Sequence, residues 1–141
     1  MAVTYTNIWY TKILKKLKTI LSSEYPKIPI FIRGEQEIKG TIYFEIYGNG
    51  QDSISRDTNG RFTNLYFLSI DLYFTKGISS KSVEQYYNYI NRTEQLIANN
   101  SDIESFWYDG NVDSINVNAG LSTDEMISTS TINFSCRYTK V

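Results

Sequence analysis

The chain has 141 residues, close to the commonest length of one domain, and its 41% of apolar residues excludes a disordered protein. The formal net charge is −1, which argues against a dedicated nucleic-acid-binding protein, since such proteins are normally basic. With two prolines and eight glycines, no stretch has the composition of a linker. We therefore predict one globular domain over residues 1–141.

The charges are distributed unevenly along the chain. Residues 1–33 carry six Lys or Arg and one Glu, whereas residues 93–136 carry seven Asp or Glu and no Lys or Arg. Two interpretations remain open. The charged stretches are either two solvated faces or opposite faces of a subunit that meet different partners.

Three features predict where the protein resides. Cys136 is the only cysteine, so no internal disulfide can form. The N-terminus shows no signal-peptide pattern, and no segment approaches the roughly 20 apolar residues of a membrane span. We expect a protein made and assembled in a reducing cytosol, without a membrane partner.

The first half of the chain predicts one helix and two short strands. Apolar residues at spacings of three to five predict an amphipathic helix over 6–22, capped by Thr6 or Asn7. The apolar run 28–33 contains Pro29, which favours an edge strand. Strict alternation over 41–47 predicts a second strand, joined to the first by a hairpin at 34–40.

Residues 48–61 predict a long polar loop. They contain three glycines and separate the strand at 41–47 from a strong strand at 62–75, which alternates so clearly that we place it centrally in the sheet. Loops of this length are commonly mobile or functional, so we expect a flexible hairpin loop here.

The second half predicts a helix followed by two strands. Ser82 and Gln85 fit a capping box that opens a helix ending near Asn99 and Asn100. Its predicted inner stripe consists of Val83, Tyr86, Tyr87, Ile90, Glu94 and Ile97. Residues 103–118 contain a turn and an alternation that slips by one residue, which indicates a β-bulge. Residues 128–139 alternate as a closing strand.

These elements give the order α-β-β-β-α-β-β. The pattern predicts an α+β protein whose four- to five-stranded, mainly antiparallel sheet carries two helices on one face. The opposite faces of the strands carry Tyr, Thr, Ser and Asn, which suits a sheet exposed to solvent or to a neighbouring subunit.

The sequence offers few residues for catalysis. It has no histidine, which excludes histidine-dependent nucleophiles, histidine bases and the usual zinc sites. We expect Cys136 to be a buried apolar residue. The carboxylate pairs Asp102 and Glu104, Asp109 and Asp113, and Asp124 and Glu125 fit either an acid–base or metal site or ordinary turn chemistry. We favour turn chemistry, and predict a non-enzyme without a cofactor or metal.

Two groups of side chains are candidates for protein contacts. Lys12, Lys15 and Lys16 fall mainly on the polar side of the first helix, where they are either solvated or bind a partner. Tyrosines on the second faces of strands, among them Tyr43, Tyr47 and Tyr73, are either half-buried strand residues or interface residues. The number of tyrosines, twelve, favours an interaction surface.

The order of these elements resembles the tail-terminator (tail-completion) proteins of long-tailed bacteriophages. The likeness covers nearly the whole chain and rests on topology, because the family has no signature motif. It is carried by the helix 6–22, the strand 42–47, the loop 48–61, the strand 66–74, the helix 83–97 and the last strand 132–138.

The resemblance implies a virion structural protein of the phage neck, at the head–tail junction, assembled in the host cytoplasm. Such proteins form a hexameric ring that caps the tail tube, ends tube polymerisation and joins the tail to the head connector or stopper protein. By this analogy the subunit or tube contacts include Gln51, Asp52, Arg56 and Arg61, and the three lysines face a neighbouring subunit or the connector. The acidic stretch would face the DNA that passes through the lumen.

Other functions remain open on the sequence alone. They are another head–tail connector, neck or tube-like phage protein, and a small non-enzymatic protein-binding module. The position of the ring in a virion would separate the first from a tail terminator, and a stable heterodimer would favour the second.

Overall fold

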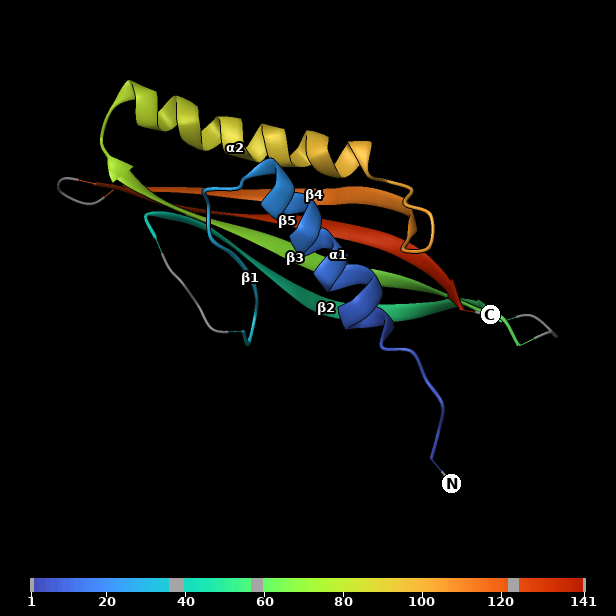
Figure 1. Ribbon diagram of the computed structural model, residues 1–141. Coiled ribbons are helices and arrows are strands. Elements are labelled where there is room, and N and C mark those ends of the chain that lie inside the picture. Colours follow the sequence, from blue (N-terminus) through green and yellow to red (C-terminus); the bar gives the residue numbers. More distant parts are fainter. Residues whose placement is uncertain (1, 36–39, 57–59, 122–124, 141) are drawn as a thin grey trace.

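The computed structural model describes residues 2–35, 40–56, 60–121 and 125–140, and has an α+β fold built on a five-stranded sheet (Figure 1). The predicted α+β class with a sheet of four to five strands is thereby confirmed. The elements in chain order are η1 (Ile8–Leu14), α1 (Lys15–Glu24), β1 (Ile30–Ile32), β2 (Ile42–Arg56), β3 (Phe62–Gly77), α2 (Ser80–Asn99), β4 (Tyr108–Leu121) and β5 (Glu125–Lys140).

The strands lie in the order β1-β2-β3-β5-β4, so β3 is central as predicted. The pairs β2–β3, β3–β5 and β4–β5 are antiparallel, but β1 pairs with β2 in parallel. The predicted hairpin at 34–40 is therefore wrong. Instead of a hairpin, a side-chain contact closes the end of β1. The Glu35 carboxylate accepts hydrogen bonds from the Ile32 amide at 2.7 Å and from the Lys18 ammonium at 3.0 Å. Residues 36–39 of that segment lie outside the described residues.

The predicted first helix begins with a π-helical stretch, η1, and continues as α1. Asn7 is the cap, because its side chain accepts the Tyr10 amide at 3.1 Å. The wide π turn accounts for the five-residue spacing between Ile8 and Ile13, which both contribute to the core. The helix runs to Glu24, two residues beyond the predicted end.

Two details of the second helix differ from the prediction. Ser79, not Ser82, is its cap, because the Ser79 hydroxyl accepts the Ser82 amide at 3.0 Å. Glu94 is exposed, and the neighbouring Thr93 is buried instead, where its hydroxyl shares a hydrogen bond of 2.9 Å with Tyr25. The buried side of α2 therefore includes Thr93 in place of Glu94, and it faces α1 more directly than the predicted stripe does.

The core lies between the helices and alternate residues of the strands. Trp9, Tyr25 and Tyr86 of the helical segments contact the rings of Tyr66, Phe44 and Phe74, which alternate along β2 and β3. The predicted alternation is confirmed in β3 and β5, where the fully buried side chains include Leu68, Ile70, Leu72, Ile132 and Phe134.

The predicted loop at 48–61 is mostly strand. β2 continues through Arg56 and pairs with β3, which begins at Phe62. Register shifts at Gly48/Gly50 and Ser53/Ser55 absorb the irregular sequence. The segment Gln51–Arg56 is exposed throughout, so its sequence shows no apolar alternation even though its backbone is paired. Within the predicted loop, residues 57–59 lie outside the described part of the chain.

Candidate interaction surface

One face of the sheet contacts neither of the described helices, and we call it the open face (Figure 1). Its side chains alternate with those that contact η1, α1 and α2. The side chains of the open face come from all four long strands and are mostly polar or aromatic. They include Tyr43, Glu45, Tyr47, Asn49, Ser69, Asp71, Tyr73, Ser114, Thr131, Asn133 and Ser135.

Three aromatic rings form a stack at the β1 side of the open face. Tyr43 and Tyr73 are directly opposite in the β2–β3 pair, with ring centroids 4.5 Å apart and an interplanar angle of 14°. Phe31 of β1 extends the stack at 5.7 Å from Tyr43. Stacked aromatic pairs of this kind give a rigid contact area, so the predicted tyrosines do gather on one surface.

A cluster of charged groups lies beside the aromatic stack. Glu45 and Asp71 are directly opposite in the β2–β3 pair, an arrangement that alone is destabilising. The Arg33 guanidinium compensates them, with Nη2 at 2.8 Å from Glu45 and 3.7 Å from Asp71. Asp71 also accepts the hydroxyls of Thr131 at 2.7 Å and Tyr47 at 3.4 Å.

The Arg33 cation has favourable contacts with both the carboxylates and an aromatic ring of the cluster. The Arg33 guanidinium also lies over the Tyr47 ring, 3.5 Å from its centroid. The hydrogen bond to Glu45 raises the pKa of Arg33, so its charge is fixed. Burial raises the pKa of Tyr73, and the carboxylates of Asp71 and Glu45 raise it further.

A ladder of side-chain hydrogen bonds crosses the middle of the open face. Asn49 of β2 donates to Ser69 of β3 at 2.6 Å, and Ser69 donates to Asn133 of β5 at 2.8 Å. Asn133 in turn donates to Ser114 of β4 at 2.9 Å. We call these four residues the polar ladder. Ser69 is buried, whereas Asn49 and Ser114 are exposed and Asn133 is half-buried. Because each hydroxyl and amide binds the next, the accessible members of the ladder form a preformed polar surface rather than a row of freely rotating side chains.

The predicted contact residues Gln51, Asp52, Arg56 and Arg61 lie in the last part of β2 and directly before β3. This is the opposite end of β2 from the residues that pair with β1. The Gln51 side chain accepts the Trp9 indole N–H at 2.7 Å, which fixes it to η1. Trp9 also requires Gly48, since a Cβ there would lie 2.7 Å from the indole ring. Asp52 is exposed, and Arg56 lies over the Phe62 ring at 4.7 Å. Arg61 is exposed directly before β3.

The three predicted lysines do not form one surface. Lys12 and Lys16 lie over the Phe106 ring at 5.3 Å and 4.6 Å from its centroid, and both are half-buried. Lys15 alone of the three is exposed. Helical spacing placed them on a polar side, but Phe106, 90 residues later, covers that side in the fold.

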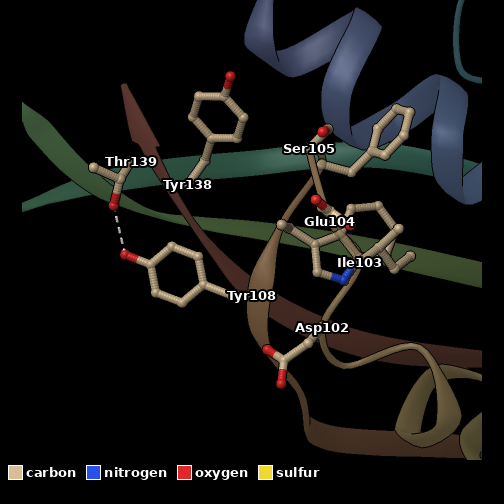
Figure 2. Close-up of a pocket in the computed structure, with 9 residues that line it drawn as sticks. Asp102, Ile103, Glu104, Ser105, Tyr108, Tyr138 and Thr139 are labelled. Atoms are coloured by element: carbon tan, nitrogen blue, oxygen red, sulfur yellow. Dashed lines mark hydrogen bonds between the residues drawn. The ribbon is translucent and has the colours of Figure 1, made fainter. Parts of the chain in front are cut away.

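A hollow of about 410 Å³ is lined by the segment that joins α2 to β4 and by the end of β5 (Figure 2). It is lined by residues 102–108 with Tyr138 and Thr139, and a 2.6 Å hydrogen bond joins the hydroxyls of Tyr108 and Thr139. The Asp102 carboxylate accepts the amide of Asp109, whose φ of 51° makes the turn tight. Asp102 thus stabilises this turn.

Asp109 and Asp113 have similar local partners. Asp113 accepts hydrogen bonds from Ser135 at 3.0 Å and Asn111 at 3.1 Å, and Asp109 lies 3.7 Å from Arg137. Asp124 lies outside the described residues. Among the residues that the structure describes, no group of three or more His, Cys, Asp or Glu could hold a metal ion.

Cys136 is fully buried, as predicted, and desolvation raises the pKa of its thiol to about 12. The thiolate, which is the reactive form of cysteine, is therefore very rare at neutral pH. None of the helices in the described ranges is both long enough and apolar enough to cross a membrane.

Sequence reasoning missed the residues that organise the open face. Arg33, Glu45 and Asp71 are far apart in the sequence and meet only through the parallel β1–β2 pair and the β2–β3 register. Alternation alone places Glu45 with Tyr43 and Asp71 with Tyr73, but it cannot show that the carboxylates are opposite each other.

No family model and no curated protein matches this chain. Among solved structures, 27 chains are similar. One of them matches with a TM-score of 0.50 at 13% identity, over 96% of this chain and 98% of its own length, and its name describes no function. At this identity the likeness concerns the fold alone, and the chain shares its overall topology with that protein.

Proposed function

We propose that the protein is a virion structural protein of a bacteriophage neck, which forms a ring on the end of the tail tube. In this function it ends tube polymerisation and joins the tail to the head connector. The proposal starts from the order of elements and gains support from the open face, which is the observation that carries it.

The open face suits the inner wall of a ring because it is polar, ordered and uncovered by the described helices. The helices pack on the opposite side of the sheet, where they would form the outside of the ring. The polar ladder crosses four strands without an intervening apolar residue on that face, so the surface is stable in contact with water.

The charge of the open face suits a lumen through which DNA passes. Glu45 and Asp71 are held by Arg33, and the Asp113 carboxylate reaches the same face through Ser135. Glu45 and Asp71 are buried and share the single cation of Arg33, while Asp113 is exposed, so the carboxylates outnumber the cation and would repel phosphates. DNA would then not be retained by nonspecific binding.

The far end of the β2–β3 hairpin suits contact with a neighbouring ring. Exposed backbone-paired strands such as Gln51–Arg56 present side chains rigidly, and in this segment Asp52 and Arg56 are candidates for contacts with the tail-tube protein. Lys15 is the candidate for contact with the connector, because Lys12 and Lys16 are engaged with Phe106.

The test is co-assembly of the purified protein with a tail-tube protein from the same genome. We expect sedimentation velocity to show a ring-sized oligomer in the presence of tubes, and electron microscopy to show rings at the ends of tubes of limited length. The proposal fails if the protein stays monomeric and the tubes grow as they do without it. A stable complex with one unrelated protein would instead favour a binding module.

A further inference from the structure

The outer edge of β4 is an open strand edge. β4 is the last strand in the sheet order, and in the described chain no strand pairs with its other side. Ser114–Leu121 pairs with β5 in unbroken register and contains neither a charged residue nor a proline. Protected edges normally carry such residues or bulges, and β4 has its bulges and both its aspartates only before Ser114.

An apolar strip lies beside this edge on the helix-bearing side. The Tyr86 hydroxyl donates a hydrogen bond to the Thr129 carbonyl at 2.8 Å and lies 3.5 Å from the Asn118 carbonyl. These contacts place the first turns of α2 over this half of β4. Val83 and Tyr87, one turn apart on α2, are exposed, and so is Val117 of β4 at 45%. We call Val83, Tyr87 and Val117 the edge strip.

The opposite side of the molecule carries a segment that fits such an edge. Residues 2–6 read Ala-Val-Thr-Tyr-Thr, in which Val3 is 81% and Tyr5 is 75% exposed. These alternating β-branched and aromatic residues have high strand propensity, yet they belong to no described helix or strand. The segment leaves the molecule on the side of β2, where Trp9 contacts Gln51 and Gly48 (Figure 1).

We propose that residues 2–6 of one copy add as a strand to the Ser114–Leu121 edge of a second copy. This inference rests on the proposed function, since it names how neighbouring subunits of the ring would join. Five residues extend over roughly 16 Å, which is shorter than the eight-residue edge that receives them.

The side chains match on both faces of the added strand. In a strand, residues two apart share a face, so Val3 and Tyr5 cover the edge strip together. Thr4 and Thr6 then lie beside Asn116 and Asn118, whose pairing with Thr131 and Thr129 places them on the open face. Strand addition of this kind gains affinity from backbone hydrogen bonds and specificity from alternate side chains.

Charge and position favour a second copy of this chain as the partner. The donor segment precedes the lysine-rich η1 and α1. The receiving edge directly follows the exposed Asp113, and helical spacing puts the exposed Glu94 on the same side of α2 as Val83 and Tyr87. Donor and acceptor lie on opposite sides of the sheet, so each copy can give one strand and receive one. Such head-to-tail contacts close into rings when the rotation between copies permits it.

Cysteine cross-linking tests the pairing directly, because the native Cys136 is buried. One preparation carries Val3→Cys and another Val117→Cys, and the two are mixed under oxidising conditions. We expect at least about tenfold more cross-linked dimer than with the control mixture of Val3→Cys and Ser53→Cys, since pairing raises the local concentration of the two thiols. Equal yields, or no cross-link in samples that contain oligomers, would overturn the inference.

A charge variant gives an independent measurement. Val117→Lys places a charge in the edge strip, and we expect it to weaken self-association about tenfold or more by sedimentation. Ile78→Lys is the matched control, since Ile78 is a similarly exposed apolar residue (53%) outside the strip. Circular dichroism would check that both variants fold. If wild type and both variants form the same oligomer, the strand addition is wrong and the ring proposal stands. If wild type stays monomeric even with tube protein, both are wrong.

Discussion

The two faces of the sheet are built from the same strands but differ in the kind of side chain they carry. On the helix-covered face, side chains such as Leu68 and Ile70 are fully buried. On the open face, their sequence neighbours Ser69 and Asp71 are buried as well, but they lie in hydrogen-bonded and charged networks rather than among apolar side chains. The first face supplies most of the stability through apolar burial, and the second offers an ordered surface to a partner. Adjacent residues of β3 should therefore respond very differently to substitution.

The largest effect is expected on the helix-covered face. Ile70→Ala removes a fully buried side chain from the central strand, and we expect a loss of about 2–5 kcal/mol in the free energy of unfolding. Urea denaturation followed by circular dichroism would measure it. A loss below about 1 kcal/mol would mean that this face is not the main source of stability.

A smaller effect is expected from the charged cluster. Arg33→Met leaves Glu45 and Asp71 opposed without their cation, and we expect a loss of about 1–2 kcal/mol, reduced by solvent because the Arg33 side chain is half exposed. The double variant Arg33→Met with Asp71→Asn should recover part of that loss. No recovery would show that Arg33 acts through its contact with Tyr47 instead.

The polar ladder should contribute less still. Ser69→Ala removes the hydroxyl that links Asn49 to Asn133, and we expect a loss of about 1 kcal/mol, because both amides keep access to water. The same unfolding measurement applies, with Thr63→Ser as a control that keeps a hydroxyl opposite Thr139. A loss as large as that of Ile70→Ala would remove the distinction between the two faces.

The smallest effect concerns the end of β1 and depends on pH. The Ile32 amide, and then Lys18, lower the pKa of Glu35 from its ordinary value of about 4.5. A carboxyl group with a lowered pKa stabilises the fold above its unfolded pKa, and this contribution is lost as the pH falls through its folded pKa. Wild type should therefore exceed Glu35→Gln in stability at neutral pH, and the difference should shrink below about pH 4.5. A constant difference across this range would exclude the carboxylate as its cause.

Sequence alone predicts the helix-covered face better than the open face. Alternation in 62–75 and 128–139 is a local signal of burial, and it identified Leu68, Ile70 and Phe134 correctly. The sequence predicts a loop at the polar end of β2, because paired strands that are exposed on both faces carry no such alternation. The meeting of Arg33 with Glu45 and Asp71 depends on a parallel pairing and a register that no local pattern encodes.

The position of β5 has a consequence for synthesis on the ribosome. β3 and β4 both precede β5 in the chain, yet β5 lies between them and pairs with each over almost its whole length. While residues 125–140 are still inside the exit tunnel, the inner edges of β3 and β4 have no strand to pair with. The nascent chain at that stage holds a finished β2–β3 hairpin and a helix without a complete sheet beneath it, which is the state in which unpaired edges invite aggregation. Protection of this intermediate by chaperones would therefore matter more than protection of the finished fold.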